Sequence, residues 1–380
     1  MPSGSEIAAG LMPQLNALQT DKRDISRKTT GISCVTMEKT LKRFEKIMEQ
    51  RLSPLKANAV AWLWKRLSGL TTPQLWCMAR PLARVVQLLN PRERRVTRRN
   101  LGQAFPALDK GARAQLVTES LAHSTATMLE LGKVWLGDED AVRDSILEVH
   151  GRNLLDDARA EGRGVIVLAP HFGNWEVLNF WLSSHFPFTA MYEPPKFERL
   201  DPIIRHGRER MGASLVPTNS RGVAALLKAL KRAEAIGILP DQEPGRGSGV
   251  FADFYRRPAY TATLLPKLVA RTDARVITGV AQRLEDGHGF AIHFLAADEG
   301  VYDEDEATSA RGVNASVEAA IALAPAQYQW EYKRWRKSPE EIAKQSGWRE
   351  KRFYPRDDSW LSLKGWRRHL KRRRRNASQD

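Results

Sequence analysis

The chain has 380 residues, of which 42% are hydrophobic and 27% are charged. This length and composition are typical of a globular protein and exclude a largely disordered chain. The 60 lysines and arginines against 44 acidic residues leave a formal net charge of +16. Such a charge favours polyanionic partners, namely nucleic acid, an anionic lipid surface or a small acidic protein.

Cysteines and histidines are few and scattered. Cys34 and Cys77 do not form a C-x-x-C pair, so we expect neither a disulfide framework nor a cysteine metal site, and a reducing compartment fits. The HExxH motif is absent, so we predict no metal and no cofactor. The GxSxG motif is absent too, which leaves an acyl-serine route without support.

The N-terminal part predicts helices near a membrane. Residues 1–36 are polar and patternless and indicate a disordered leader, followed by amphipathic helices over 37–93. No apolar run reaches the ~18–20 residues that a spanning helix needs. Apolar residues recur at helical spacing at Leu75, Met78, Ala79, Leu82, Val85, Val86 and Leu89. Such a helix either packs on the core or lies in a membrane interface, with basic residues toward lipid phosphates.

From residue 164 the pattern changes to alternating strands and helices. We predict strands over Gly164–Ala169, Ala235–Leu239, Arg275–Ala281 and Phe290–Leu295, and helices over Trp175–Phe186, Val223–Ala233 and Thr261–Ala270, with a loop over Pro240–Gly249. This alternation predicts an α/β fold with a largely parallel sheet over residues 94–348. The remaining residues, 349–380, form a basic tail that contains Lys371-Arg-Arg-Arg-Arg375.

The stretch Ala169-Pro-His-Phe-Gly-Asn-Trp-Glu176 concentrates polar chemistry directly after a predicted strand. Five residues on an α-helix turn by about 500°, so His171 and Glu176 would not share a helix face. We therefore expect His171 in the strand-to-helix turn and Glu176 in the first helical turn. Asn174 is the expected N-cap, and Gly173 permits a tight backbone, and we expect both residues to contribute to substrate binding. A general base, an orienting carboxylate and backbone N–H groups for an anion then lie within six residues.

Spacing alone does not establish catalysis, because most such His and Glu pairs are surface or core residues. The position favours a site, since open α/β sheets bind ligands at the carboxyl ends of their strands. The block also resembles the signature of the lipid A biosynthesis acyltransferases, a branch of the lysophospholipid acyltransferase superfamily. Further blocks resemble this family in the family's order over about Arg94 to Pro339: Arg99-Asn-Leu, Ala104-Phe-Pro106, Tyr192-Glu-Pro-Pro-Lys196, Arg205-His-Gly-Arg-Glu-Arg210, Gly237–Gly245, Gly249-Val-Phe251 with Phe254, and Pro325–Arg334.

The resemblance implies a single central, mostly parallel or mixed sheet flanked by helices, with an N-terminal helical region. It assigns catalysis to His171 and Glu176 and substrate binding to Arg208 and Asp241. Arg208 would clamp a phosphate of the acceptor or donor. Asp241 would position the acceptor or the histidine. The alternatives are a solvated charge for Arg208 and a loop-capping residue for Asp241.

The implied reaction moves an acyl chain from a thioester on acyl carrier protein to a hydroxyl of a lipid A precursor. The family commonly begins with a hydrophobic membrane anchor, whereas charged residues interrupt the corresponding region here. We therefore expect peripheral or monotopic attachment to the anionic cytoplasmic face of the inner membrane. One alternative keeps the chemistry on another glycolipid or aminolipid, and another is a non-catalytic protein that binds lipid or nucleic acid. Nucleic acid is not expected as a partner, because no zinc-finger spacing or RNP-like aromatic motif accompanies the basic tail.

Overall fold

The computed structural model describes residues 54–89, 91–195, 197–339 and 353–354. The chain divides into two compact units, residues 1–58 and 59–380, and the second contains the sheet. The predicted leader over 1–36 and most of the predicted tail over 349–380 lie outside the described residues. Within that tail segment, Tyr354 is buried, and its hydroxyl donates to Asn100 Oδ1 at 2.7 Å.

A seven-stranded mixed sheet lies at the centre, in the order β1-β9-β8-β2-β5-β3-β4. Its strands are β1 (Ile146–His150), β2 (Val165–Leu168), β3 (Phe188–Tyr192), β4 (Ser214–Pro217), β5 (Ala235–Ile238), β8 (Arg275–Arg283) and β9 (Phe290–Ala296). The strands from β8 to β4 run parallel, whereas β9 runs antiparallel to β8 and parallel to β1. The predicted α/β fold with a mostly parallel sheet is confirmed.

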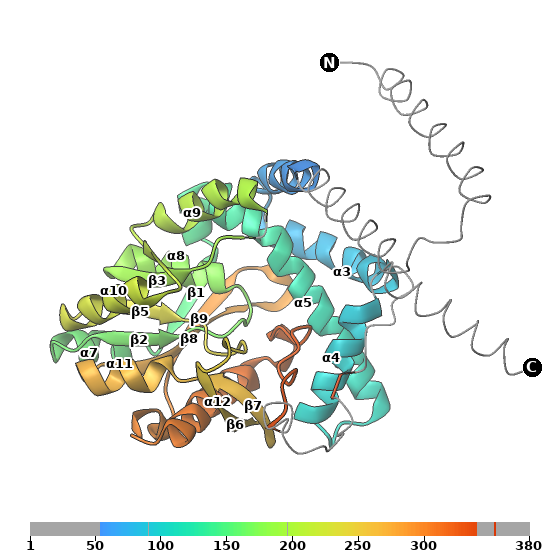
Figure 1. Cartoon of the computed structure of the whole chain (residues 1–380). Coiled ribbons are helices and arrows are strands. Elements are labelled where there is room, and N and C mark those ends of the chain that lie inside the picture. The colour runs from blue at the N-terminus through green and yellow to red at the C-terminus, as the bar shows by residue number, and fades with distance from the viewer. Residues whose placement is uncertain (1–53, 90, 196, 340–352, 355–380) are drawn as a thin grey trace, which may run out of the picture. The chain divides into compact units, whose positions relative to one another are not determined.

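Helices α3 to α12 flank this sheet (Figure 1). They are α3 (Thr72–Leu89), α4 (Pro91–Ala104), α5 (Lys110–Leu136), α6 (Glu139–Arg143), α7 (Asn153–Ala160), α8 (Trp175–His185), α9 (Asp201–Glu209), α10 (Ser220–Lys231), α11 (Leu264–Thr272) and α12 (Glu306–Leu323). Short 3₁₀ turns lie at η1 (Glu198–Leu200), η2 (Glu285–Gly287), η3 (Glu299–Tyr302) and η4 (Pro325–Gln327).

Strand β2 is buried on both faces, as expected of a central parallel strand. Ile166 and Leu168 pack with apolar residues of α10 and α11. Val167 points to the other face, where it lies with Leu178 of α8 around Gly279. The continuous apolar run that predicted this strand therefore reflects helices on both sides of it.

Helix α3 has one face in the core and one in solvent. Leu75 and Ala79 pack against residues of α5, whereas Met78, Leu82 and Val85 are exposed. The predicted packing on the core is thus found for one face of α3, and the other face is exposed. Within the described ranges, no helix has the length and apolar character needed to cross a bilayer.

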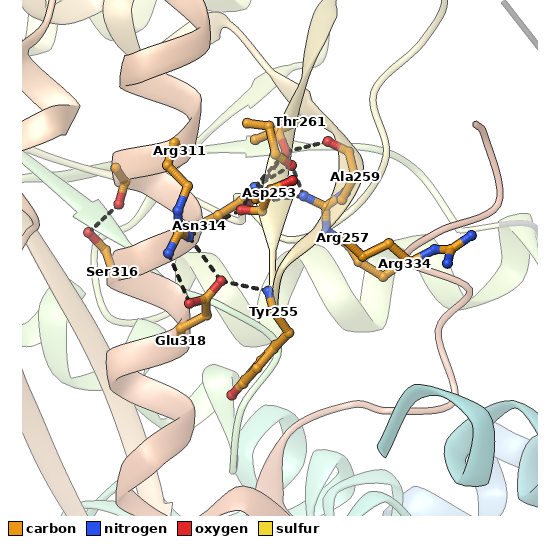
Figure 2. Close-up of polar contacts among 12 residues, drawn as sticks. Asp253, Tyr255, Arg257, Ala259, Thr261, Arg311, Asn314, Ser316, Glu318 and Arg334 are labelled. Atoms are coloured by element: carbon orange, nitrogen blue, oxygen red, sulfur yellow. Dashed lines mark hydrogen bonds and ion pairs between the residues drawn. The ribbon is translucent and has the colours of Figure 1, made fainter. Parts of the chain in front are cut away.

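A two-stranded hairpin of β6 (Gly249–Phe254) and β7 (Arg257–Ala262) packs on α12. Figure 2 shows Glu318 accepting hydrogen bonds from Arg311 and from the Tyr255 backbone N–H, at 2.9 and 2.8 Å. Asn314 donates to Thr261 Oγ1 at 3.1 Å. The predicted helix start at Thr261 is wrong, because Thr261 lies in β7 and α11 begins at Leu264. The hairpin fixes one end of the loop over 239–248, which follows β5.

Candidate active site

His171 and Asp241 meet at one edge of the sheet. His171 follows β2 and Asp241 follows β5, and these two strands are parallel neighbours, so their carboxyl ends coincide. His171 Nδ1 lies 2.9 Å from Asp241 Oδ1, and the His171 backbone N–H donates to Asp241 Oδ2 at 2.9 Å. The aspartate is thus held by both the ring and the main chain of the histidine.

The ionised form of Asp241 is favoured at this position. Burial opposes its ionisation, but the charge of His171 and the hydrogen bonds from its ring and backbone outweigh burial and hold the pKa of Asp241 below its ordinary value. A carboxylate accepts hydrogen bonds, so in the neutral form of the His171 ring Nδ1 carries the proton and Nε2 presents its lone pair. This tautomer is the one that a general base needs.

Glu176 lies in a separate buried cluster. Its carboxylate accepts from the indole N–H groups of Trp135 and Trp175, at 3.0 and 3.1 Å. Arg208 of α9 donates to it through Nε, at 3.1 and 3.0 Å, and through Nη2 at 2.5 Å. Burial opposes ionisation of Glu176, but the charge and hydrogen bonds of Arg208, with those of the two indoles, hold its pKa below the ordinary value.

The carboxylate partner of His171 therefore differs from the one that the sequence suggested. The prediction paired the ring with Glu176, whereas the structure gives it Asp241 and gives Glu176 to Arg208. Because α8 begins at Trp175, Glu176 is the second helical residue and points toward α5 and α9. The predicted phosphate clamp, Arg208, is 23% exposed and directs two of its nitrogens to Glu176.

Gly173 and Asn174 shape the turn between β2 and α8. Gly173 has φ +54°, and a Cβ there would lie 1.9 Å from the Ala281 carbonyl oxygen, so only glycine fits. Asn174 is the predicted N-cap: its side chain accepts from the backbone N–H groups of Glu176 and Val177, at 3.1 and 3.3 Å. The N–H groups of Gly173 and Asn174 donate to Gln327 O and Ala281 O, at 2.9 and 3.0 Å. Of the N–H groups expected to bind an anion, those of Gly173, Asn174, Glu176 and Val177 are thus occupied within the protein.

A buried ion pair between α5 and β8 supports this turn. Arg283 of β8 and Glu130 of α5 have side chains 0% and 1% exposed and are joined through Nε and Nη2, at 2.7 and 2.5 Å. Glu130 also accepts from Asn174 Nδ2 at 2.9 Å. Thr127 donates to the Gly173 carbonyl oxygen at 2.8 Å. These bonds tie the turn that carries His171 to α5 and β8.

A cavity of about 290 Å³ opens beside His171. Its walls come from α3, α4, α5, the turn after β2 and the segment after α12. Most of the wall surface is apolar, and its apolar side chains include Leu82, Val86, Leu121 and Met128. Gly173 and Trp175 lie beside the histidine at one part of the wall. The cavity thus places the ring of His171 beside a largely apolar wall.

The acid Glu331 also lines this cavity, where it accepts from Ser124 Oγ at 3.0 Å. Burial raises the pKa of Glu331 from 4.5 to about 7. The folded protein therefore binds this proton more tightly than the unfolded chain, and stability is lost as the pH rises through this interval. From about pH 5 to about pH 8, the unfolding free energy of the wild type should therefore fall. This fall should exceed that of Glu331→Gln by up to about 3 kcal/mol.

Urea unfolding of both proteins at the two pH values measures this difference. The exposed substitution Glu198→Gln removes the same charge and should leave the pH dependence unchanged. An identical pH dependence in wild type and Glu331→Gln would show that Glu331 is ionised in the folded protein throughout this range.

Several residues of the site have no role in the sequence prediction. Gln242 Nε2 lies 3.1 Å from His171 Nε2. The Tyr328 hydroxyl is hydrogen-bonded to Asp241, and its burial, together with the charge of Asp241, raises the pKa of Tyr328. Both residues, with Glu331, belong to blocks that carry the family resemblance, Gly237–Gly245 and Pro325–Arg334. Their position in these blocks was the signal by which the sequence could have identified them as site residues. Glu130 and Arg283 lie outside those blocks, so no signal in the sequence indicated their role.

Comparison with known proteins identifies the family. Residues 47–337 match the model of the bacterial lipid A biosynthesis acyltransferases. Similar proteins from Escherichia coli K12 include the lipid A biosynthesis palmitoleoyltransferase, 27% identical over 74% of this chain and 90% of that protein. The lauroyltransferase is 25% identical over 74% and 91%, and the myristoyltransferase is 24% identical over 66% and 77%. The family match covers most of the chain, which is therefore an acyltransferase and belongs to the bacterial lipid A biosynthesis acyltransferases.

Proposed function

We propose that the protein transfers a fatty acyl group from a thioester on acyl carrier protein to a hydroxyl of a lipid A precursor, with His171 as the general base. The observation that carries this proposal is the His171–Asp241 pair at the wall of an apolar cavity. The ring is 12% exposed, so it is shielded yet reachable by a substrate. A base at the end of an apolar space suits a reaction between two lipid chains.

In the proposed reaction the acceptor hydroxyl donates its proton to His171 Nε2, and its oxygen attacks the thioester carbonyl carbon. The tetrahedral intermediate then collapses as the C–S bond breaks. The leaving thiolate takes the proton from the imidazolium, so that the base is restored. Asp241 stabilises the imidazolium and keeps the ring in the required tautomer.

Glu176 and Arg208 have supporting roles in this proposal. Because Glu176 is buried among Trp135, Trp175 and Arg208, it acts as a positioning residue that joins the start of α8 to α5 and α9. Arg208 uses Nε and Nη2 for this contact. The other edge of its guanidinium is our candidate for a phosphate of the acceptor.

An acidic carrier protein as donor is supported by the surface of α4. Arg94, Arg95 and Arg98 are exposed, and none forms an ion pair with another residue in the described ranges. The same helix contributes Glu93 to the cavity wall. Because exposed charges attract at long range and are screened by salt, kcat/KM for the acyl carrier protein thioester should fall steeply with salt. A small acyl thioester without the protein should show little of this dependence.

Attachment to the cytoplasmic face of the inner membrane is supported by α3. Met78, Leu82 and Val85 form an exposed apolar stripe, and Arg80 and Arg84 are exposed on the same helix. An apolar stripe next to basic residues is the pattern of helices that lie in a membrane interface. The proposal is therefore peripheral attachment, in which the cavity wall formed by α3 faces the lipid phase that holds the acceptor.

Replacing Asp241 by asparagine tests the role of the pair. The amide cannot stabilise the imidazolium and permits the wrong tautomer of His171, so we expect kcat to fall about 10²–10³-fold. The measurement is the initial rate of acyl transfer from acyl carrier protein to a lipid A precursor. A variant that folds normally and retains more than about a tenth of the wild-type rate would contradict the proposed mechanism.

A further inference from the structure

We propose that Gln242 is a catalytic residue of this site. In the free enzyme its side-chain amide occupies the place of the acceptor hydroxyl on His171, and during transfer it donates a hydrogen bond to the oxyanion. This inference rests on the proposed acyl transfer, and it names the donor that the reaction requires.

The first observation is the contact between the amide and the base. Gln242 Nε2 lies 3.1 Å from His171 Nε2. Since Asp241 accepts from Nδ1, Nε2 bears the lone pair and the amide N–H is the donor. The attacking hydroxyl must donate to this same lone pair. The amide and the hydroxyl therefore exclude each other, and the amide marks where the hydroxyl binds.

The second observation is that Gln242 lies between two anchored residues. Asp241 is 3% exposed and bound to His171, and the Glu243 backbone N–H donates to the Tyr332 hydroxyl at 2.8 Å. Gln242 itself is exposed. Its side chain can turn away when the acceptor enters, while the backbone on both sides stays in place. After that turn, the amide remains next to the reacting oxygen.

The third observation is a shortage of other donors. From His171 to Val177, the backbone N–H groups of all residues except Trp175 donate within the protein. Gln327 Nε2 donates to the Arg283 carbonyl oxygen at 2.7 Å. The negative charge on the tetrahedral intermediate develops two bonds from the attacking oxygen and needs a donor there. The Gln242 amide is already within hydrogen-bond distance of the base at that place.

Steady-state kinetics of Gln242→Ala test the catalytic step. Loss of an oxyanion donor should lower kcat about 10²-fold, while KM for the acceptor changes less than about threefold. Gln242→Glu should lose kcat similarly, because its carboxylate cannot donate. A carboxylate beside the imidazole favours the cation, so the acid limb of its pH–rate profile should also move to higher pH. Asp241 and Glu331, the other acids around this ring, are unchanged in both variants.

Gln115→Ala, at an exposed position on α5, is the matched control and should retain full activity. An unchanged or raised kcat in Gln242→Ala would overturn the proposal, since the amide would then only block the base. A loss of kcat in Gln329→Ala with none in Gln242→Ala would also overturn it. That result would assign the donor to Gln329, which lines the cavity beside His171.

Chemical labelling tests the free enzyme without substrate. Diethyl pyrocarbonate reacts with the unprotonated imidazole nitrogen, and peptide mass spectrometry gives the rate at His171. Removal of the amide in Gln242→Ala should make this labelling several-fold faster, and an unchanged rate would contradict the placement of the amide on Nε2. Because no transfer is involved, the result stands even where the wild-type protein fails to move acyl chains.

Discussion

Replacing His171 by alanine should slow acyl transfer by about 10³–10⁴-fold and leave the fold intact. The ring is the only histidine in the described part of the chain that lines the cavity, and its Nδ1 is held by Asp241 at 2.9 Å. Without it, no base takes the proton of the acceptor hydroxyl at this position. The initial rate of transfer, measured beside the urea unfolding midpoint, separates loss of chemistry from loss of structure.

The chain provides a matched control for this variant. His150 also lies against a carboxylate, with Nε2 2.8 Å from Glu148 Oε2, but this pair is about half exposed on β1. His150→Ala should therefore retain the wild-type rate. A folded His171→Ala protein that turns over within about tenfold of wild type would show that the base lies elsewhere.

Removing the charge of Glu130 should have the largest effect on stability. In Glu130→Gln, Arg283 would remain fully buried without a counter-charge, which costs about 3–5 kcal/mol in unfolding free energy. The variant also weakens the support of Asn174, so the turn that carries His171 should loosen and activity should fall. Urea unfolding monitored by tryptophan fluorescence measures the expected loss.

An exposed ion pair provides the comparison for Glu130. Glu161 binds Arg275 Nη2 at 2.8 and 2.9 Å, but both side chains are at least 40% exposed. Glu161→Gln should shift the urea midpoint little, because water replaces the lost contact. Equal midpoints for Glu130→Gln and Glu161→Gln would mean that the buried pair does not stabilise the fold.

The alternation of strands and helices in the sequence predicted the core of the fold. The runs that became β2, β5, β8 and β9 are apolar because helices or neighbouring strands cover them. The β6–β7 hairpin was missed because its stability comes from distant partners. Asn314 and Arg334, far along the chain, bind Thr261 and Tyr260 of β7. Such contacts leave no local pattern, so the strand containing Thr261 was assigned to a helix.

The same limit explains the partner of His171. Glu176 lies in the same sequence block, so its spacing to the histidine was visible in the sequence. Asp241 follows a different strand, and only the pairing of β2 with β5 brings it to the ring. The family resemblance already marked Asp241 as important. The structure adds which atom of the histidine it contacts and leaves Nε2 facing Gln242.

The most direct test of the central claim is mass spectrometry of lipid A from a deletion strain and its parent. The deletion should lack one acyl chain, the wild-type gene should restore it, and the His171→Ala gene, expressed at the same level, should not. Restoration by the variant would contradict the role of His171. Lipid A that is identical in the deletion strain and its parent would contradict the proposed acceptor.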